Sequence, residues 1–569
     1  MTQPNRVATC RLDRLCLSSN VLTAVVAASF GRRGSAVLME NSGKVIITRD
    51  GCEILSSLRL EDSVLSFAVS GILQFAKQRG DGSKTGLVLL NNAINVTNDI
   101  FFSTGMREMS AETSFARCST LKVVRRLRQH LLPRLSQLAV RRYCSIISPK
   151  DENWSRIIDA SLISFLETRF PKYLAGKLAA ILSEFLQVNS KCHSLQEIVL
   201  FALNNIQNII FQVYKCPFRM SRVTKGFIIS RDFKIELKKS DNCVRKVLFW
   251  SLPLEQSTDS FSSFLTIDTS DKNTFMRSIF HSSFGMQKLM EEFQNQKIEL
   301  IVSSLHFPDW AVAACKQHEI ALVDFVSDEE FSFLVQHLKV SPLVCKTEIF
   351  DHASQCEVEV NAIYLGSSRF VHFTCHSSQM IISGPTVTQC NQFSKALTAC
   401  LKMLRNWLED SKNFLLEQKI INNDESLADF PIKDNCIEND LRGTLVWSPS
   451  DGFIQCAMLL VIEKYPCLMK LGPEERKLLI SMLAEVPQIL NGMLVAKTRF
   501  SLLKHLHETF KEIEQDHDNG RLKERAIAEC RIENPLNFIE IAHNAMLRLE
   551  SILRIESVVH VKHRSTKVN

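Results

Sequence analysis

A glycine-rich loop between two apolar segments is the stretch of this sequence best equipped for chemistry. It reads Gly80-Asp81-Gly82-Ser83-Lys84-Thr85 and is followed at once by the apolar residues 86–90. Glycines let a backbone approach a phosphate closely, and the free N–H groups at the start of a helix attract anions. The Asp81 carboxylate could hold a magnesium ion between phosphates. The spacing is not that of a Walker loop, because no glycine directly precedes Lys84, so a polar turn that caps a helix is an equal interpretation.

A second carboxylate, Asp50, lies between a predicted strand and a predicted helix. Residues 44–48 are rich in β-branched side chains and predict a strand, and residues 52–60 predict a helix. A carboxylate at this junction could orient a phosphate or a water molecule. The residues alone favour the simpler role of a helix cap.

Other catalytic and metal-binding motifs are absent from the sequence. It contains no Gly-x-Ser-x-Gly elbow and no His-Glu-x-x-His helix. Its 18 cysteines include no Cys-x-x-Cys pair. Zinc-ligand spacing is therefore missing, and we expect free thiols in a reducing compartment.

Length and composition describe an ordinary globular protein of about three domains. The 569 residues are 45% hydrophobic and 23% charged, which is enough apolar surface for large cores. The 68 basic and 61 acidic residues leave a net charge of +7, which does not by itself indicate nucleic-acid binding. No secretory signal and no membrane-spanning run is evident, so we expect a cytosolic or nuclear protein without a membrane span.

Predicted elements change character twice along the chain. Strands and helices alternate in the middle, whereas helices dominate on both sides. The relevant segments are the helical residues 154–215, the alternating residues 226–365 with a βαβ unit at 298–325, a helix at 388–408, an acidic segment at 409–446 and helices at 454–555. This pattern predicts a mainly α protein in which an α/β domain is inserted into a second domain, itself inserted into a third.

A basic amphipathic stretch at residues 122–142 is the most strongly charged part of the N-terminal half. We expect it to form a solvated helix face, broken at Pro133. A nuclear signal or a surface for an acidic partner is the alternative.

The order of several short motifs resembles the group II chaperonins of the TCP-1 family. The matching segments are Gly31-Arg32-Arg33-Gly34 for the family's Gly-Pro-Lys-Gly, residues 44–51 for Val-Thr-Ile-Thr-Asn-Asp-Gly, residues 80–85 for Gly-Asp-Gly-Thr-Thr, residues 382–386 for Leu-Arg-Gly-Pro-Thr and residues 552–559 for Ile-Leu-Arg-Ile-Asp-Asp-Ile-Ile. Together they cover nearly the whole chain. Within that family the chain resembles the divergent, vertebrate-type chaperonin-like proteins of Bardet–Biedl syndrome, through residues 300–304, 308–309, 327–330, 399–405 and 559–563.

The resemblance implies a nested architecture of equatorial, intermediate and apical domains. The implied boundaries are 1–145 and 447–569 for the two halves of the equatorial domain, 146–222 and 366–408 for the two parts of the intermediate domain, 223–365 for the apical α/β domain, and 409–446 for an acidic insertion or linker.

The resemblance also implies a site for ATP with magnesium. Its residues would be Gly31, Asp50, Gly51, Gly80, Asp81, Gly82, Ser83, Lys84, Thr85 and Gly452, with Asp81 as the metal ligand. We predict no catalytic residue, because Ala399 stands where the family has its hydrolytic aspartate and a methyl group cannot orient a water molecule.

Two further departures fall in the same implied site. Ser450 and Asp451 replace glycines that face the phosphates, and Asn534 replaces an aspartate on the nucleotide side. Arg32, at the family's proline position, could reach a phosphate, but we expect it to be solvent-exposed. Asp451 as a substitute carboxylate is an alternative that requires near-correct placement. We therefore expect nucleotide binding with weak or absent hydrolysis.

By resemblance, the chain would be a chaperonin-like assembly factor for the BBSome, the coat complex of ciliary membrane traffic, with a role in ciliogenesis. Implied partners are other Bardet–Biedl chaperonin-like proteins (types 6 and 12), TRiC chaperonin subunits and BBSome subunits. The implied location is the cytoplasm near the basal body or cilium, with a minor nuclear pool. The alternatives are an ATP-hydrolysing subunit of a folding ring and a nuclear regulatory binding protein; we do not expect nucleic acid as a partner.

Overall fold

A computed structural model gives the fold of most of the chain. It describes residues 7–9, 12–32, 34–41, 44–101, 111–190, 193–237, 244–252, 289–344, 355–421, 443–450, 452–465, 469–495, 511, 521–555 and 557–559. Statements about structure below refer to these residues.

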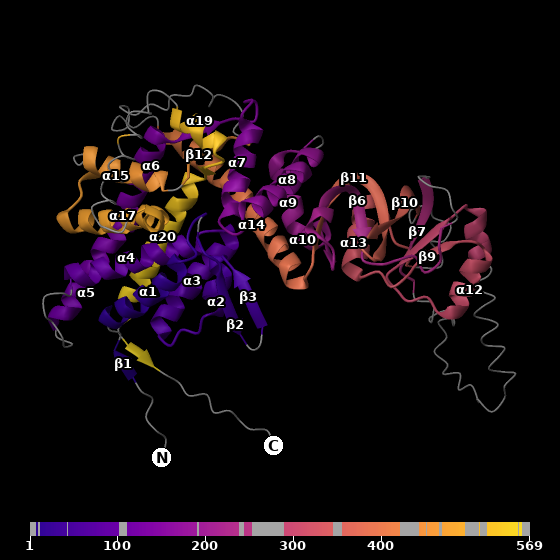
Figure 1. The fold of residues 1–569 in the computed structure, drawn as a ribbon, viewed down its shortest axis with the longest axis horizontal. Helices are drawn as coiled ribbons and strands as arrows, with labels where there is room; N and C mark the ends of the chain where they lie inside the picture. The colour runs from indigo at the N-terminus through magenta and orange to yellow at the C-terminus, as the bar shows by residue number, and fades with distance from the viewer. Residues whose placement is uncertain are drawn as a thin grey trace, which may run out of the picture. The chain divides into compact units, whose positions relative to one another are not determined.

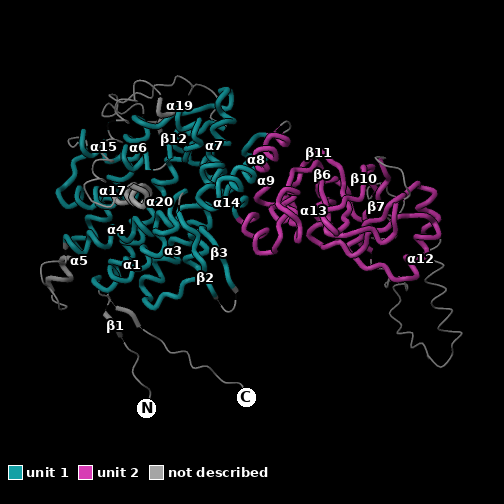
Figure 2. Tube along the Cα trace, viewed as in Figure 1, with its two compact units in different colours: residues 1–180, 194–200, 396–569 teal, residues 181–193, 201–395 magenta. Residues whose placement is uncertain are grey.

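The chain forms two compact units, and one is inserted into the other (Figure 2). Unit 1 comprises residues 1–180, 194–200 and 396–569, and unit 2 comprises residues 181–193 and 201–395. One level of the nesting predicted from the sequence is therefore present, because the two ends of the chain share one unit.

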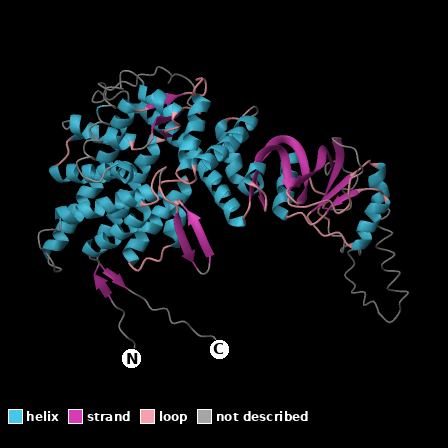
Figure 3. Ribbon diagram, in the orientation of Figure 1, coloured by secondary structure: helices cyan, strands magenta, loops and turns pink. Residues whose placement is uncertain are grey.

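Unit 1 is a bundle of helices drawn from both ends of the chain (Figures 1 and 3). Its helices are α1 (Leu12–Ala27), α2 (Gly51–Ser57), α3 (Ser63–Arg79), α4 (Ser83–Phe101), α5 (Ala111–Arg126), α6 (Leu132–Tyr143), α7 (Trp154–Glu167), α15 (Phe453–Lys464), α17 (Pro473–Val495), α19 (Arg521–Ala528) and α20 (Pro535–Leu553). The central helix is α4, which packs against α1, α17 and α20. Residues 86–94 of α4 are buried on every side, as expected for a helix surrounded by others.

Short strands join segments of unit 1 that are far apart in sequence. An antiparallel hairpin pairs β2 (Val37–Asn41) with β3 (Lys44–Thr48), and β3 has the bounds that the sequence predicts. A three-stranded sheet has the order β13 (Ile532–Glu533), β12 (Leu445–Pro449), β4 (Ser145–Ile147). Strands β1 (Val7–Thr9) and β14 (Ser557–Val559) pair near the two ends of the chain.

Unit 2 is built on a seven-stranded sheet with the order β5-β11-β10-β7-β8-β9, in which β6 also pairs with β11. The elements are β5 (Ile210–Tyr214), β6 (Arg222–Ile229), β7 (Val244–Trp250), β8 (Leu300–Ser303), α12 (Asp309–Gln317), β9 (Ala321–Val323), α13 (Asp328–Leu338), β10 (Gln355–Leu365) and β11 (Ser368–Gly384). Strands β8 and β9 are parallel and α12 lies between them in sequence, so the predicted βαβ unit is confirmed. Helix α13 begins at a capping box, since Ser327 Oγ accepts from the Glu330 N–H at 3.3 Å.

Three helices belong to the connections around the insertion: α8 (Lys172–Asn189), α9 (Leu195–Asn204) and α14 (Val387–Ile421). Helix α14 extends well past the predicted end at residue 408, into the segment that the sequence assigns to an acidic insertion. The reason is burial, because Phe414 and Leu415 are 9% and 0% exposed in the core of unit 1. Residues 422–442 of that segment lie outside the described residues.

The basic stretch also differs from its prediction. Pro133 does not break the helix, because a π-helical turn at Leu127–Leu131 leads directly into α6 with Pro133 in its first turn, where a missing N–H is tolerated. Arg125 and Arg128 contact Glu550 at 3.2 and 3.0 Å, and Arg126 lies 3.0 Å from Glu475. The Arg125 and Arg126 side chains are 42% and 54% exposed, as the predicted solvated face requires, whereas the Arg128 side chain is only 15% exposed. The three ion pairs nevertheless join α20 and α17 to the basic stretch.

None of the described helices combines the length and the hydropathy that crossing a bilayer requires.

Candidate nucleotide site

The glycine loop connects α3 to α4 and requires glycine at two positions. Gly80 and Gly82 have φ angles of 85° and 94°, a backbone region that residues with a side chain rarely adopt. The Gly80 N–H donates to the Ala76 carbonyl at 2.8 Å and ends α3. A Cβ atom would lie 2.5 Å from the Ala399 carbonyl oxygen at Gly80, and 2.5 Å from Ile541 Cδ1 at Gly82. The loop is therefore held between α14 and α20.

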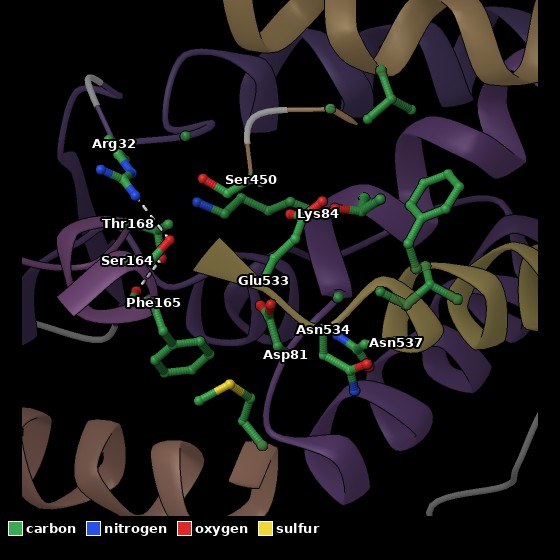
Figure 4. A pocket seen from close by; sticks show the side chains of 18 of the residues that line it. Arg32, Asp81, Lys84, Ser164, Phe165, Thr168, Ser450, Glu533, Asn534 and Asn537 are labelled. Atoms are coloured by element: carbon green, nitrogen blue, oxygen red, sulfur yellow. Dashed lines mark hydrogen bonds between the residues drawn. The ribbon is translucent and has the colours of Figure 1, made fainter. Parts of the chain in front are cut away.

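A cavity of about 170 Å³ borders this loop (Figure 4). Of the predicted site residues, Gly31, Asp81, Gly82, Lys84, Thr85 and Gly452 line it. Asp50, Gly51, Gly80 and Ser83 are not among the lining residues. The structure thus brings the loop together with two glycines that are distant in sequence, and it places the other four residues behind the cavity wall.

The remaining lining residues include both apolar and polar side chains. Aromatic and aliphatic side chains come from Phe165, Met403, Val486, Phe538 and Ile541. Polar side chains come from Arg32, Ser164, Thr168, Ser450, Gln455, Glu533, Asn534 and Asn537. A small ligand with one flat apolar end and one polar end matches such a lining.

Several polar groups of the cavity have no partner within the described chain. Ser450 Oγ and Gln455 Oε1 are buried without a hydrogen bond, and Gln455 is only 4% exposed. The Asp81 carboxylate interacts electrostatically with Lys84 and Arg169. Since buried polar atoms without partners are unfavourable, Ser450 and Gln455 favour a polar ligand that would pair with them.

Lys84 ties three parts of unit 1 together at the cavity. Its ammonium donates to the carbonyls of Ser29 and Arg49 at 2.7 and 2.9 Å. Burial, reinforced by the nearby Arg169 guanidinium, lowers the pKa of Lys84 to about 8. An ammonium group has three N–H donors, so one remains for an anion in the cavity.

Asp50 acts as a helix cap in the structure. Its side chain accepts from the Cys52 N–H at 3.0 Å at the start of α2, and its Oδ1 lies 3.9 Å from Arg169 Nη2. The next residue, Gly51, packs against the loop, because a Cβ there would lie 2.5 Å from both the Lys84 Cγ and the Ser83 Oγ. These residues support the loop from outside the cavity.

Arg32 is not solvent-exposed, contrary to the prediction. Its guanidinium donates to Glu167 at 3.0 Å, to Ser164 Oγ at 2.9 Å and to the Cys530 carbonyl at 2.6 Å. Figure 4 shows this side chain at the edge of the cavity. Local sequence carries no signal for these contacts, because Glu167 and Cys530 are 135 and 498 residues away from Arg32. Arg33 lies outside the described residues.

A polar network runs below the cavity around Asn534. Asn534 caps α20 by accepting from the Leu536 N–H at 3.0 Å, and its amide donates to Asp410 at 3.3 Å. Arg79 pairs with Asp410 and also donates to Asn537 at 2.8 Å. Nothing in the local sequence marks Arg79, Asp410 and Asn537 as neighbours, so these three residues were not predicted as part of the site.

Ala399 lies directly behind the loop, where its carbonyl oxygen meets Gly80. Met403, one helical turn later, is the α14 residue that lines the cavity. The lining carboxylates are Asp81 and Glu533, and the described residues include no group of three potential metal ligands. Asp451, the alternative carboxylate, lies outside the described residues.

The fold of this chain is similar, over nearly its whole length, to that of a solved chaperonin structure. The crystal structure of a group III chaperonin in the open state matches with a TM-score of 0.64, over 96% of this chain and 98% of that chain, at 14% sequence identity. The chain has the chaperonin fold. The predicted fold class is therefore confirmed.

Curated relatives agree with the predicted resemblance. The chain is 24% identical over 443 residues to the BBSome complex assembly protein BBS10 of Mus musculus, which is 72% of this chain and 60% of that protein. It is 25% identical over 440 residues to the protein of the same name from Homo sapiens, again 72% of this chain and 59% of that protein. A weaker match, 29% identity over 105 residues, is the Chaperonin GroEL 2 of Chlamydia pneumoniae.

The chain spans about three fifths of the length of the BBS10 relatives that it matches. No family model matches the chain.

Proposed function

We propose that the chain is a chaperonin-like assembly factor that helps to fold or assemble the BBSome and thereby serves ciliogenesis. The observation that carries this proposal is similarity over 72% of the chain to proteins named for BBSome complex assembly. The match to a group III chaperonin over 96% of the chain supports a chaperonin-like role.

Nucleotide binding is the second part of the proposal. The phosphates of ATP would lie against the backbone of the glycine loop and Gly31, near the Lys84 ammonium. The base would lie among the apolar side chains that line the cavity. Magnesium, when bound, supplies positive charge between phosphates, and Asp81 is the carboxylate that we assign to it. The unpartnered Ser450 and Gln455 support this ligand.

Hydrolysis is weak or absent in this proposal. Ala399 offers no carboxylate to orient water, and Asp50 is engaged as a helix cap outside the cavity. Losing one positioned catalytic group costs a factor of about 10² to 10⁴ in rate. The chain would thus be regulated by whether a nucleotide is bound, and it would not depend on repeated rounds of ATP hydrolysis.

The domain assignments and partners belong to the same proposal. Residues 1–145 and 447–569 would form the equatorial domain, residues 146–222 and 366–408 the intermediate domain, and residues 223–365 the apical domain that faces clients. The partners would be Bardet–Biedl chaperonin-like proteins of types 6 and 12, TRiC subunits and BBSome subunits. The site of action would be the cytoplasm near the basal body.

Depletion and rescue in ciliated cells test the assembly role. Sedimentation of BBSome subunits should shift from the assembled complex to free subunits when the chain is depleted, and wild type should reverse the shift. Affinity-tagged wild type should also recover chaperonin and BBSome subunits. An unchanged sedimentation profile after depletion contradicts the proposal.

Two other functions are weaker on the structure. An ATP-hydrolysing ring subunit needs a water-orienting carboxylate, and α14 contributes Met403 to the cavity instead. A nuclear regulatory protein needs a free basic surface at residues 122–142, but Arg125, Arg126 and Arg128 are paired with buried glutamates.

A further inference from the structure

Arg169 places a positive charge directly behind the glycine loop. Its side chain is 10% exposed. Its Nη2 donates to the Gly80 carbonyl at 2.8 Å and lies 3.9 Å from Asp50 Oδ1. The guanidinium also lies over the Phe165 ring, 4.3 Å from its centroid. Since Arg169 is not one of the cavity's lining residues, it acts on a ligand through the field it creates and through the loop it holds.

The charges around the loop balance without a metal ion. Burial lowers the pKa of Arg169, but the attraction of Asp50 and Asp81 outweighs burial and the pKa is raised overall, so the guanidinium keeps its charge. Lys84 contributes the second cation beside the loop. The formal charges of Asp50, Asp81, Arg169 and Lys84, the charged groups of the loop and of the residues that support it, cancel. A nucleotide therefore does not meet a net negative loop when it brings its own negative phosphates.

A divalent cation normally has that neutralising role where carboxylates and phosphates share a site. We propose that Arg169 makes a divalent metal dispensable for nucleotide binding in this cavity, because its guanidinium offsets the carboxylates of Asp81 in the glycine loop and of Asp50 beside it. The inference rests on the nucleotide binding proposed above. Asp81 stays free to accept a metal, so magnesium can accompany the nucleotide without being required.

Equilibrium binding of a fluorescent ADP to the purified full chain tests this directly. The affinity of wild type should change by less than about threefold between excess magnesium and excess EDTA. Arg169→Gln leaves the loop net negative, so its affinity in EDTA should fall by about tenfold or more and magnesium should restore it. Arg169→Lys keeps the charge and should bind as wild type does in both conditions.

A compensating variant separates charge from structure. Asp50→Asn in the Arg169→Gln background restores neutrality, and Asn remains a good helix cap for α2. This double variant should again bind ADP in EDTA. Manganese alone, followed by electron paramagnetic resonance, is the second readout, and Arg169→Gln should bind it more tightly than wild type does.

The possible failures are distinguishable. Wild-type binding that needs magnesium overturns the role of Arg169 and leaves nucleotide binding intact. Absence of binding in both conditions overturns the nucleotide part of the proposed function and this inference with it, but leaves the assembly role untouched. An equal manganese affinity of wild type and Arg169→Gln also contradicts the inference. The wild-type comparison needs no variant, so it decides the matter even if Arg169→Gln fails to fold.

Discussion

Adding one methyl group to the glycine loop is a sharp test of how the site is built. In Gly80→Ala the new side chain must adopt a φ of 85°, which costs about 1–2 kcal/mol for a residue with a Cβ. The same Cβ would lie 2.5 Å from the Ala399 carbonyl oxygen, whereas real Cβ contacts below 3.0 Å essentially never occur. Displacing a packed backbone costs about 1–3 kcal/mol more. We expect Gly80→Ala to lower the free energy of unfolding by about 2–5 kcal/mol.

Gly176→Ala is the matched control, because no atom lies within 4 Å of a Cβ at this position in α8. Replacing a helical glycine in open space should stabilise the chain by about 0.5–1 kcal/mol. Urea denaturation followed by circular dichroism compares the two variants, and ADP binding shows whether the loop still functions. If Gly80→Ala and Gly176→Ala were equally stable, the loop would not be pressed against α14, and the placement of Ala399 behind it would be refuted.

Three further changes probe the charges of unit 1. Glu550→Ala removes a buried carboxylate and leaves Arg128, which is 15% exposed, without its counter-charge, so it should lower the free energy of unfolding by about 1–3 kcal/mol. Glu529→Ala breaks only exposed pairs and should lower it by under about 1 kcal/mol; equal values would refute the structural role of the basic stretch. Because the pKa of Lys84 is about 8, ADP affinity should fall about tenfold as the pH rises from 7 to 9, and calorimetry should detect proton uptake on binding above pH 8. Lys84→Met should remove this pH dependence. An ADP affinity of wild type that does not change with pH would contradict the role of Lys84. Asn534→Asp puts a carboxylate beside Asp410 and should destabilise the chain by about 1–3 kcal/mol, whereas Asn534→Ser, which keeps an N-cap without the charge, should cost less; an equal loss in the two variants would argue against repulsion as its cause.

Local sequence predicted the parts of the fold that local physics decides. Strand β3 has the predicted bounds because β-branched residues mark it, and helix α12 lies within the predicted βαβ unit. The glycine loop was identified for the same reason, since Gly80 and Gly82 need left-handed backbone. The end of α14 was missed because Phe414 and Leu415 are isolated apolar residues in an acidic segment, and only the core of unit 1 makes them helical.

Local sequence did not predict contacts between segments that are far apart in the chain. Arg32 was expected in solvent because its partners Glu167 and Cys530 are far away in the chain. The ion pairs of the basic stretch with Glu550 were not predicted, because Glu550 is distant in the sequence from these arginines. Asp50, in contrast, caps α2 as its local sequence favours.

The central claim is that this chaperonin fold keeps a nucleotide cavity but has lost efficient hydrolysis. Binding and turnover of ATP measured on one preparation of the full chain test it most directly. The account predicts saturable binding that Asp81→Ala weakens only in the presence of magnesium, together with turnover at background. Steady turnover that Asp81→Ala abolishes would contradict it.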